Sequence, residues 1–483
     1  MAKKIKNYIN GQWVVSKTSQ FLPVFDPGKG KAIAQVPLST KEEVNRAGQA
    51  AQKAFKTWSR VPAPERVEYL FKLKRLIDDH FQEIARILTT EHGKTLKEAR
   101  GEVKRALQNL ETACGIPTLM QGKILASAAQ DIDEYFIREP VGPAAIIMPF
   151  NFPAMISFWY FPYALACGCT CIIKPSEITP LTQNKIFELI DEVGFPEGVI
   201  NLINGAKDTV GAILENKDIK AVASVSSTPV AKVIYEACAR THKRACCQAG
   251  AKNFLVVAPD ANLKKSIPNI INSAFGNTGQ RCLAGSILVG IDGIYEKLKE
   301  EIVRAAKKIK VGHGLDRGTY MGPLVRDIAR QRVLNYIETG IKEGAELILD
   351  GRKIKIKKYP GGFYLGPSIF DKVTPRMKIA KDEIFGPLLA IIKVKNLDEA
   401  INLIDRCPYG NAASIYTSSG RLAQEFKHRV KCGNIGIQIG TVAPLAYFSF
   451  AGMKDSFFGT LHGQAPDAID FFTDKKVIIE KWW

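Results

Sequence analysis

The sequence has no regular cysteine spacing of the kind that forms disulfides. Its ten cysteines are scattered along 483 residues, and no apolar signal-peptide core follows the first residues, MAKKIKNYINGQW. Free thiols without a secretory leader are typical of proteins kept in a reducing compartment. We therefore expect a cytoplasmic protein without structural disulfides.

Groups of metal ligands are equally scarce. The densest cluster is Cys167, Cys169 and Cys171, and their alternate spacing predicts one face of a strand, where buried cysteines pack as small hydrophobic residues. His242 and the cysteine pair at 246–247 lack a second pair of ligands. The sequence predicts no metal site.

No apolar run is long enough to cross a membrane without interruption. Residues 140–173 carry no charge and exceed the roughly 20 apolar residues of a spanning helix, but four prolines divide them. We expect a strand at PAAIIMPF, a loop at NFPAM, a buried helix through SFWYFPYALA and a second strand at TCIIK. Two apolar strands joined by a helix are typical of a parallel sheet that is covered on both faces.

Positive charge is abundant, but nucleic-acid motifs are missing. The formal net charge is +19, and the densest basic patches are KKIK at 307–310 and RKIKIKK at 352–358. Acidic residues are interleaved with the lysines, and no basic run carries interspersed aromatic residues. We expect no nucleic-acid partner, and a surface that attracts dinucleotides or coenzyme A.

Strands and helices alternate further along the chain, whose length favours two or three domains. The expected elements are a helix at 183–193, a strand at VINLING, a helix at 210–215, a strand at AVASV and a helix that begins at Pro229. Thr228 is expected to cap this last helix. A turn of this kind can bind a phosphate, although the dinucleotide motif G-x-G-x-x-G is absent.

Four motifs then follow one another in order: PFNFP at 149–153, KPSE at 174–177, FGNTGQRC at 275–282 and EIFGP at 383–387. Together they resemble the hallmark motifs of the NAD(P)-dependent aldehyde dehydrogenase superfamily. GIPTLMQG, GAKN, GQRC and SFFGTLH further resemble the CoA-acylating methylmalonate-semialdehyde dehydrogenases. The resemblance extends from NYINGQW to the end of the chain.

This resemblance implies an α/β fold with three parts. A Rossmann-type cofactor domain would comprise residues 1–121 and 139–249, and an α/β catalytic domain residues 250–444. A small β oligomerisation element would combine residues 122–138 and 463–483. An exposed strand there would pair with a neighbouring subunit, so a homodimer or homotetramer is expected.

The resemblance assigns the nucleophile to Cys282. A thiolate attacks an aldehyde readily, and a positive charge such as Arg281 lowers the pKa of a thiol. We expect an exposed turn in which Gly276, Gly279 and Gly285 let ligands approach the backbone. The alternative is a buried, inert thiol like the other nine.

The superfamily also implies an oxyanion site and a cofactor site. Asn151 would donate its amide to the oxyanion, although a simple turn residue before Pro153 is the alternative from sequence alone. Glu177 would bind a ribose 2′-hydroxyl, which favours NAD over NADP. The expected cofactor-binding residues are Phe150, Lys174, Glu177, Ser227, Glu383 and Phe385.

The chain departs from the superfamily at two places. Ser226 replaces a glycine in the turn beside the pyrophosphate, which puts cofactor affinity in doubt. Gln248 and Ala249 lie where hydrolytic members have a glutamate that activates water, and neither can act as a base. Coenzyme A is therefore the expected acyl acceptor.

Two arginines indicate a carboxylated substrate. Arg281 adjoins Cys282, and Arg105 matches the second carboxylate-binding arginine of the resembling family. The alternative for Arg105 is a surface ion pair with Glu102, one helical turn away. Ala106 replaces a glycine that relatives often have, which would crowd the pocket.

The expected reaction is the NAD-dependent oxidation of methylmalonate or malonate semialdehyde, with acyl transfer to coenzyme A and decarboxylation to propionyl-CoA or acetyl-CoA. Two alternatives remain open at this point. One is a hydrolytic dehydrogenase that releases a free acid. The other is a catalytically silent relative that only binds NAD.

Overall fold

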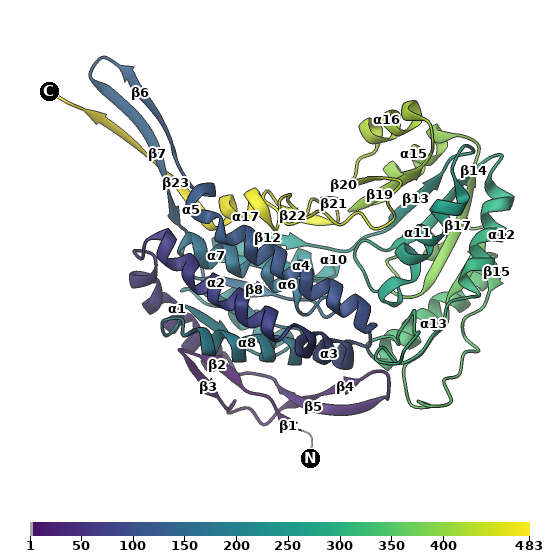
Figure 1. Cartoon of the computed structure of the whole chain (residues 1–483), viewed down its shortest axis with the longest axis horizontal. Coiled ribbons are helices and arrows are strands. Elements are labelled where there is room, and N and C mark those ends of the chain that lie inside the picture. Colours follow the sequence, from purple (N-terminus) through teal and green to yellow (C-terminus); the bar gives the residue numbers. More distant parts are fainter. Residues whose placement is uncertain (1–2) are drawn as a thin grey trace.

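The computed structural model describes residues 3–483. Two large sheets, each covered by helices, lie side by side, and a narrow β arm projects from one end (Figure 1). None of the helices in this part of the chain is both long and apolar enough to cross a membrane.

The first sheet has the strand order β22-β12-β11-β8-β9-β10-β2-β3. Its five central strands are parallel, and their residues are almost all buried. The strands are β2 (Asn7–Ile9), β3 (Gln12–Val14), β8 (Ala144–Ile147), β9 (Cys171–Lys174), β10 (Ile200–Leu202), β11 (Ala221–Val225), β12 (Arg244–Gln248) and β22 (Phe457–Gly459).

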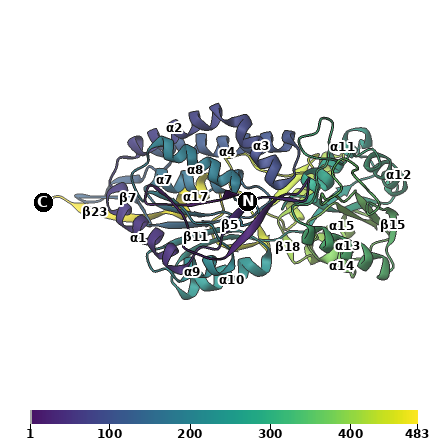
Figure 2. The same cartoon turned by 90° about the horizontal axis from the view of Figure 1, so that it is seen from below.

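Helices cover both faces of this sheet, as the uninterrupted apolar strands predict. Ile146 and Ile173 pack against the helices of one face, and Ile147 and Ile172 against those of the other. Figure 2 shows α2 and α4 on one side and α9 and α10 on the opposite side. The helices are α1 (Lys41–Trp58), α2 (Ala63–Asp79), α3 (Phe81–His92), α4 (Leu96–Cys114), α5 (Ile116–Leu119), α6 (Met155–Phe158), α7 (Phe161–Cys167), α8 (Leu181–Val193), α9 (Lys207–Glu215) and α10 (Thr228–Arg240).

The second sheet has the order β15-β16-β17-β14-β13-β19-β20 and is parallel except at β15. Its strands are β13 (Asn253–Val257), β14 (Gly285–Ile291), β15 (Glu346–Leu349), β16 (Ser368–Asp371), β17 (Leu388–Val394), β19 (Ala412–Tyr416) and β20 (Asn434–Ile437). The helices around it are α11 (Leu263–Phe275), α12 (Tyr295–Ala306), α13 (Asp327–Lys342), α14 (Lys378–Lys381), α15 (Leu397–Arg406) and α16 (Gly420–Arg429).

The projecting arm is a three-stranded antiparallel sheet. It is formed by β6 (Lys123–Ala129), β7 (Ile132–Pro140) and β23 (Thr473–Lys481), with β7 in the centre. A small separate sheet is formed by β1 (Lys3–Lys4), β4 (Phe21–Asp26) and β5 (Lys31–Pro37). The remaining elements are the paired strands β18 (Tyr409–Gly410) and β21 (Met453–Lys454), and the helix α17 (Ala465–Phe472). Among the arm residues, Ile124, Leu125, Val477 and Ile479 are exposed.

Three local predictions are wrong. The expected helix through SFWYFPYALA is broken into α6 and α7 between Phe158 and Phe161, where Pro162 restarts the helix in its first turn. Cys167 ends α7 and Cys169 follows it, so only Cys171 lies on a strand, although all three are buried.

The third concerns the start of α10. Ser227, not Thr228, occupies the N-cap position, and its side chain makes no capping hydrogen bond. The Thr228 hydroxyl instead accepts from the Gly250 backbone N–H at 3.0 Å and donates to the Asp455 carbonyl at 3.1 Å. Thr228 therefore connects α10 to two other segments.

Candidate active site

The segment before Cys282 is a tight, buried turn. The helix α11 ends at Phe275, and Asn277 and Thr278 follow with left-handed φ angles of 53° and 56°. The Cys282 carbonyl accepts hydrogen bonds from the side-chain amides of Asn253 and Asn411, each at 2.8 Å. The cysteine backbone is thus fixed by the first residue of β13 and by the residue that precedes β19 in the second sheet.

The glycines of this turn have a different role from the expected one. A Cβ on Gly276 would lie 2.6 Å from Nη1 of Arg281, and a Cβ on Gly279, whose φ is 70°, would overlap the Gly386 carbonyl. A Cβ on Gly285 would overlap the Leu255 side chain. These glycines are explained by close packing within the protein. Their expected role, to let ligands approach the backbone, remains a prediction.

Cys282 differs from the other cysteines in its exposure. All ten are free, nine are buried and Cys282 alone among the described residues is partly exposed. Burial of the thiol and the nearby carboxylate of Glu383 raise the pKa of Cys282 to about 12, and Arg281 opposes this only weakly. Arg281 lowers the pKa of the thiol, as expected, but desolvation and Glu383 outweigh it, so the pKa lies above its usual value rather than below it. Its guanidinium turns away, toward Glu98 and the Asn272 carbonyl.

This raised pKa predicts the pH dependence of thiol alkylation in the free protein. Only the thiolate reacts, and well below its pKa the thiolate fraction grows about tenfold per pH unit. We expect the rate of Cys282 modification by iodoacetamide to rise steadily from pH 7 to pH 10, as measured by peptide mass spectrometry. A rate that levels off below pH 8 would contradict this.

Asn151 lies in a buried loop that α4 and its flanking residues hold in place. Its side-chain amide donates to the Gln280 carbonyl at 3.2 Å, two residues before the thiol. The Asn151 carbonyl accepts from Nζ of Lys94 at 2.8 Å, and Lys94 forms a fully buried ion pair with Glu102 at 2.5 Å. Asn151, the expected oxyanion donor, therefore lies beside the segment that carries Cys282.

The buried ion pair between Lys94 and Glu102 was not predicted from the sequence. Glu102 also accepts from the Ala154 backbone N–H at 2.8 Å, so both ends of this ion pair hold the loop that contains Asn151. The sequence contained a signal for this pair. Glu102 lies on the apolar face of α4, where a buried charge needs a partner, and the motif HGKT just before the helix supplies Lys94.

A cavity of about 240 Å³ opens onto Cys282. Its walls include Phe152, Trp159 and Phe450, and its charged lining includes Arg105 and Arg281. Within residues 3–483, the Arg105 guanidinium donates only to the carbonyls of residues 443 and 444, each at 3.4 Å. The cavity is therefore largely apolar, and a thiol and two guanidinium groups are among the groups that line it.

Arg105 does not form the surface ion pair that the sequence left open. Glu102 is buried and paired with Lys94 instead. Ala106 is buried and does not line the cavity, so the expected crowding of the pocket by Ala106 is wrong.

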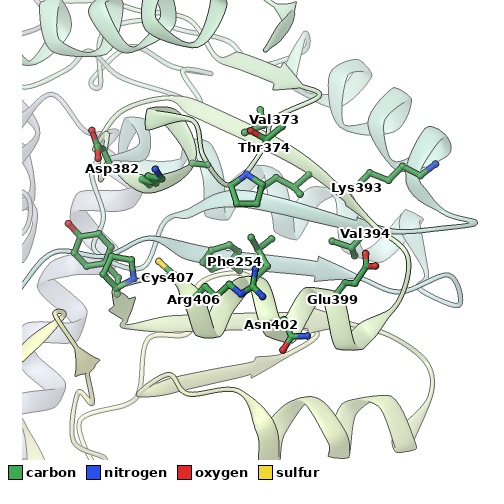
Figure 3. A pocket seen from close by; sticks show the side chains of 17 residues that line it. Phe254, Val373, Thr374, Asp382, Lys393, Val394, Glu399, Asn402, Arg406 and Cys407 are labelled. Carbon is green, nitrogen blue, oxygen red and sulfur yellow. The ribbon is translucent and has the colours of Figure 1, made fainter. Parts of the chain in front are cut away.

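A larger cavity, of about 710 Å³, lies beside the second sheet (Figure 3). Side chains of β17 and α15 line it, among them Lys393 and Arg406, and it contains none of the expected site residues. Its cysteine, Cys407, is buried, and burial raises the pKa of its thiol. The smaller cavity is therefore the candidate active site.

The expected cofactor residues lie beyond the carboxyl ends of parallel strands. In the first sheet, β8 and β11 are neighbours. Along the chain, the strands then continue from β8 to β9 and β10 on one side, and from β11 to β12 on the other. Phe150 follows β8, and Ser227 follows β11, so they flank the point where the strand order reverses. Ligands of open α/β sheets bind at this place.

Two charged residues lie at and just beyond the end of the next strand, β9. Lys174 is the buried last residue of β9, and Nζ of Lys174 lies 3.4 Å from a carboxylate oxygen of the partly exposed Glu177. The Glu177 carboxylate therefore remains accessible to a ligand hydroxyl.

The loop between α14 and β17, before a strand of the second sheet, contains the remaining two expected cofactor residues. The Phe385 ring meets Phe150 edge-on, with centroids 5.7 Å apart, and Phe385 has a left-handed φ of 59°. Glu383 accepts from the Ala251 backbone N–H at 3.0 Å, and burial raises the pKa of its carboxyl to about 7. Residues from both sheets thus meet at one place, and this arrangement fits a dinucleotide.

The two departures from the superfamily pattern have simple structural consequences. Ser226 is not among the residues with positive φ, and its backbone N–H donates to the Gln248 carbonyl at 3.0 Å. The backbone therefore does not require glycine at this position. Gln248 ends β12, and its amide donates to the Phe450 carbonyl at 2.8 Å, so it offers no base.

Fold and site together are those of a thiol-dependent dehydrogenase. The family model described as "Aldehyde dehydrogenase family" matches residues 13–478. The chain therefore belongs to the aldehyde dehydrogenase family, which confirms the resemblance and the α/β fold expected from the sequence.

Individual relatives match over the whole length. A malonate-semialdehyde dehydrogenase of Bacillus licheniformis is 47% identical and is aligned over 100% of this chain and 99% of its own. The crystal structure of methylmalonate-semialdehyde dehydrogenase from Oceanimonas doudoroffii has a TM-score of 0.98 at 38% identity, covering 100% and 99% of the two chains. A Sinorhizobium meliloti structure complexed with NAD has the same score and identity, covering 100% and 98%.

Proposed function

We propose that the protein oxidises malonate or methylmalonate semialdehyde with NAD and transfers the acyl group to coenzyme A. The observation that carries this proposal is the partly exposed Cys282 in a small apolar cavity that also contains Arg105. The names of the full-length relatives support the substrate class, and the NAD complex of a similar structure supports the cofactor.

The first chemical step is attack of the Cys282 thiolate on the aldehyde carbon. The resulting oxyanion is stabilised by the Asn151 amide and the Cys282 backbone N–H, and each such donor contributes about 2.7–4 kcal/mol. NAD, when bound, accepts the hydride. The residues proposed to hold it are Phe150, Lys174, Glu177, Ser227, Glu383 and Phe385.

The second step releases the acyl group from Cys282. Gln248 cannot activate water, whereas the thiol of coenzyme A ionises readily and attacks a thioester well. The acyl group also loses its carboxylate as carbon dioxide, so the products are acetyl-CoA or propionyl-CoA.

We propose the domain limits given by the superfamily pattern: residues 1–121 and 139–249 for the cofactor, 250–444 for catalysis, and 122–138 with 463–483 for assembly. The apolar residues exposed on the β arm support a homodimer or homotetramer. The ten free cysteines support a cytoplasmic location.

The substrate proposal predicts a selective effect of Arg105→Leu. We expect the KM for malonate semialdehyde to rise by about 10-fold or more, because a hydrogen bond between charged groups contributes about 1.5–3 kcal/mol. The KM for propionaldehyde, which has no carboxylate, should hardly change. Steady-state kinetics with both aldehydes test this.

The matched control is Arg100→Leu on the same helix. Arg100 is exposed and donates to Gln82 outside the cavity, so both KM values should remain unchanged. Equal loss for both aldehydes in Arg105→Leu would mean that Arg105 only supports the structure.

A further inference from the structure

The loop that carries Asn151 is held by side chains from outside it. This loop, residues 148–154, joins β8 to α6 and belongs to neither a strand nor a helix. Side chains of α4, of α8 and of the residues just before these helices bind its backbone at successive positions. They are Thr179 on the Phe150 carbonyl at 3.1 Å, Lys94 on the Asn151 carbonyl at 2.8 Å, Gln183 on the Pro153 carbonyl at 2.7 Å and Glu102 on the Ala154 N–H at 2.8 Å.

Lys94 and Glu102 are the charged members of this group, and both are almost completely buried. Nζ of Lys94 lies 2.5 Å from Oε2 of Glu102 and 2.8 Å from the Asn151 carbonyl. It also lies 4.3 Å from the centre of the Phe152 ring, so three neighbours surround an ammonium group that has three N–H donors. Oε1 of Glu102 accepts from two backbone N–H groups at the start of α6. The pair therefore binds the backbone on either side of Phe152.

The Asn151 amide depends on this backbone for its direction. One of the two N–H groups on its Nδ2 donates to the Gln280 carbonyl at 3.2 Å. The other is left for the oxyanion that forms when Cys282 attacks an aldehyde. The same Gln280 carbonyl accepts from the Asn277 amide at 3.0 Å, so it is fixed as well. A short amide side chain follows its backbone, and a displacement of about 1 Å at a reacting site can lower a rate about 100-fold.

Stability gives little reason for a charged pair at this place. Two charges are costly to remove from water, and replacement of a buried ion pair by apolar residues is often neutral or stabilising. Apolar side chains, however, would make no hydrogen bonds to the loop. What Lys94 and Glu102 supply is therefore direction, at three backbone positions of one short segment.

We infer that Lys94 and Glu102 are positioning residues of the oxidation: they fix the backbone on either side of Phe152 and thereby keep the Asn151 amide directed at the oxyanion. Both act through Asn151 and need no contact with the reacting atoms. The inference rests on the proposed function and refines it, because it assigns two residues on which the oxyanion donor depends. The pair carries no net charge, so its removal as a pair leaves the net charge of the cavity unchanged.

The test is a double-variant cycle between the pair and Asn151. Lys94→Met and Glu102→Gln are made together, which leaves no unpaired buried charge, and glutamine retains an oxygen acceptor for the N–H groups at the start of α6. This pair variant is made in the unchanged enzyme and in Asn151→Ala. The readout is the kcat/KM of propionaldehyde with saturating NAD, because this aldehyde carries no charge that the substituted side chains could attract or repel.

We expect Asn151→Ala alone to lower kcat/KM by about 100-fold or more. The pair variant should lower it by about tenfold or more in the unchanged enzyme, because the amide is then no longer held in direction. In Asn151→Ala the same change should cost less than about twofold, since no amide remains to be directed. This loss of additivity is the result that supports the inference.

An equal loss in both backgrounds would overturn the inference, since the pair would then support the structure as a whole. Full activity of the pair variant in the unchanged enzyme would overturn it as well. If the pair variant does not fold, Glu102→Gln alone is carried through the same cycle, because a buried lysine can release its proton when its partner is lost. The same outcomes then decide.

Alkylation of Cys282 provides a readout that a general disturbance of the site would change. Iodoacetamide reacts with the thiolate by displacement of iodide, so no oxyanion forms. The rate of modification in the pair variant should therefore remain within about threefold of that in the unchanged enzyme. A fall in the alkylation rate as large as the fall in kcat/KM would contradict the role of the pair.

The matched control is Lys97→Met, three residues along the chain from Lys94. Lys97 is exposed and lies outside the cavity. Both kcat/KM and the alkylation rate should therefore remain unchanged in this variant.

The cycle also separates this inference from the proposed function. Full activity of Asn151→Ala would contradict the proposed oxyanion donor, and the inference would be overturned with it. A large loss in Asn151→Ala, together with an equal effect of the pair variant in both backgrounds, would contradict only the role of Lys94 and Glu102.

Discussion

Replacement of Cys282 by alanine is expected to abolish NADH formation. The aldehyde carbon releases hydride only after a nucleophile has added to it, and removal of the nucleophile from such a site lowers kcat by about 10⁴-fold or more. The side chain is partly exposed, so its truncation leaves little new cavity, and the fold and NAD binding should persist. The initial rate of absorbance at 340 nm measures the loss.

Cys432→Ala is the matched control for this variant. Cys432 is buried outside the cavity, so its replacement should reduce stability slightly and leave turnover intact. Substantial turnover in Cys282→Ala, or inactivation by iodoacetamide through another cysteine, would show that Cys282 is not the nucleophile.

Much of the fold was predictable because its central strands are predominantly apolar. The runs at 144–147, 171–174 and 221–225 lie in the middle of the first sheet and have helices on both faces. Strands of this composition are typical of a parallel sheet with helices on both faces. Their order along the chain then predicts an α/β architecture.

Pairing between distant segments was not predictable in the same way. The strand β22 lies beside β12, about two hundred residues earlier, and its short run FFG carries no periodic signal. The loop that contains Phe450 likewise completes the cavity wall through contact with Trp159. Contacts of this kind depend on tertiary packing, which a local pattern does not contain.

In the site, too, the directions and pKa values of single side chains depend on contacts that the local sequence does not contain. The motif GQRC predicts that Arg281 and Cys282 are adjacent in the chain, but the direction of Arg281 depends on Glu98, which is far away in sequence. The pKa of the thiol follows from its burial and from Glu383 rather than from its neighbour. The position of Arg281 next to Cys282 in the sequence therefore did not predict the pKa of the thiol.

The second large effect is expected from coenzyme A. After hydride transfer the acyl group is held as a thioester on Cys282, and the Gln248 side-chain amide donates to the Phe450 carbonyl. Without a base to activate water, hydrolysis should be slow. A thiol acceptor needs less assistance, so acyl transfer should proceed only when coenzyme A is present.

Stopped-flow measurement of NADH formation with malonate semialdehyde tests this central claim most directly. Without coenzyme A, the account predicts a burst of about one NADH per active site followed by a slow phase, as an accumulating acyl-enzyme requires. Coenzyme A should raise the steady rate several-fold and yield acetyl-CoA by mass spectrometry. A steady rate that is independent of coenzyme A, with a free acid as the only product, would contradict the account and favour a hydrolytic dehydrogenase.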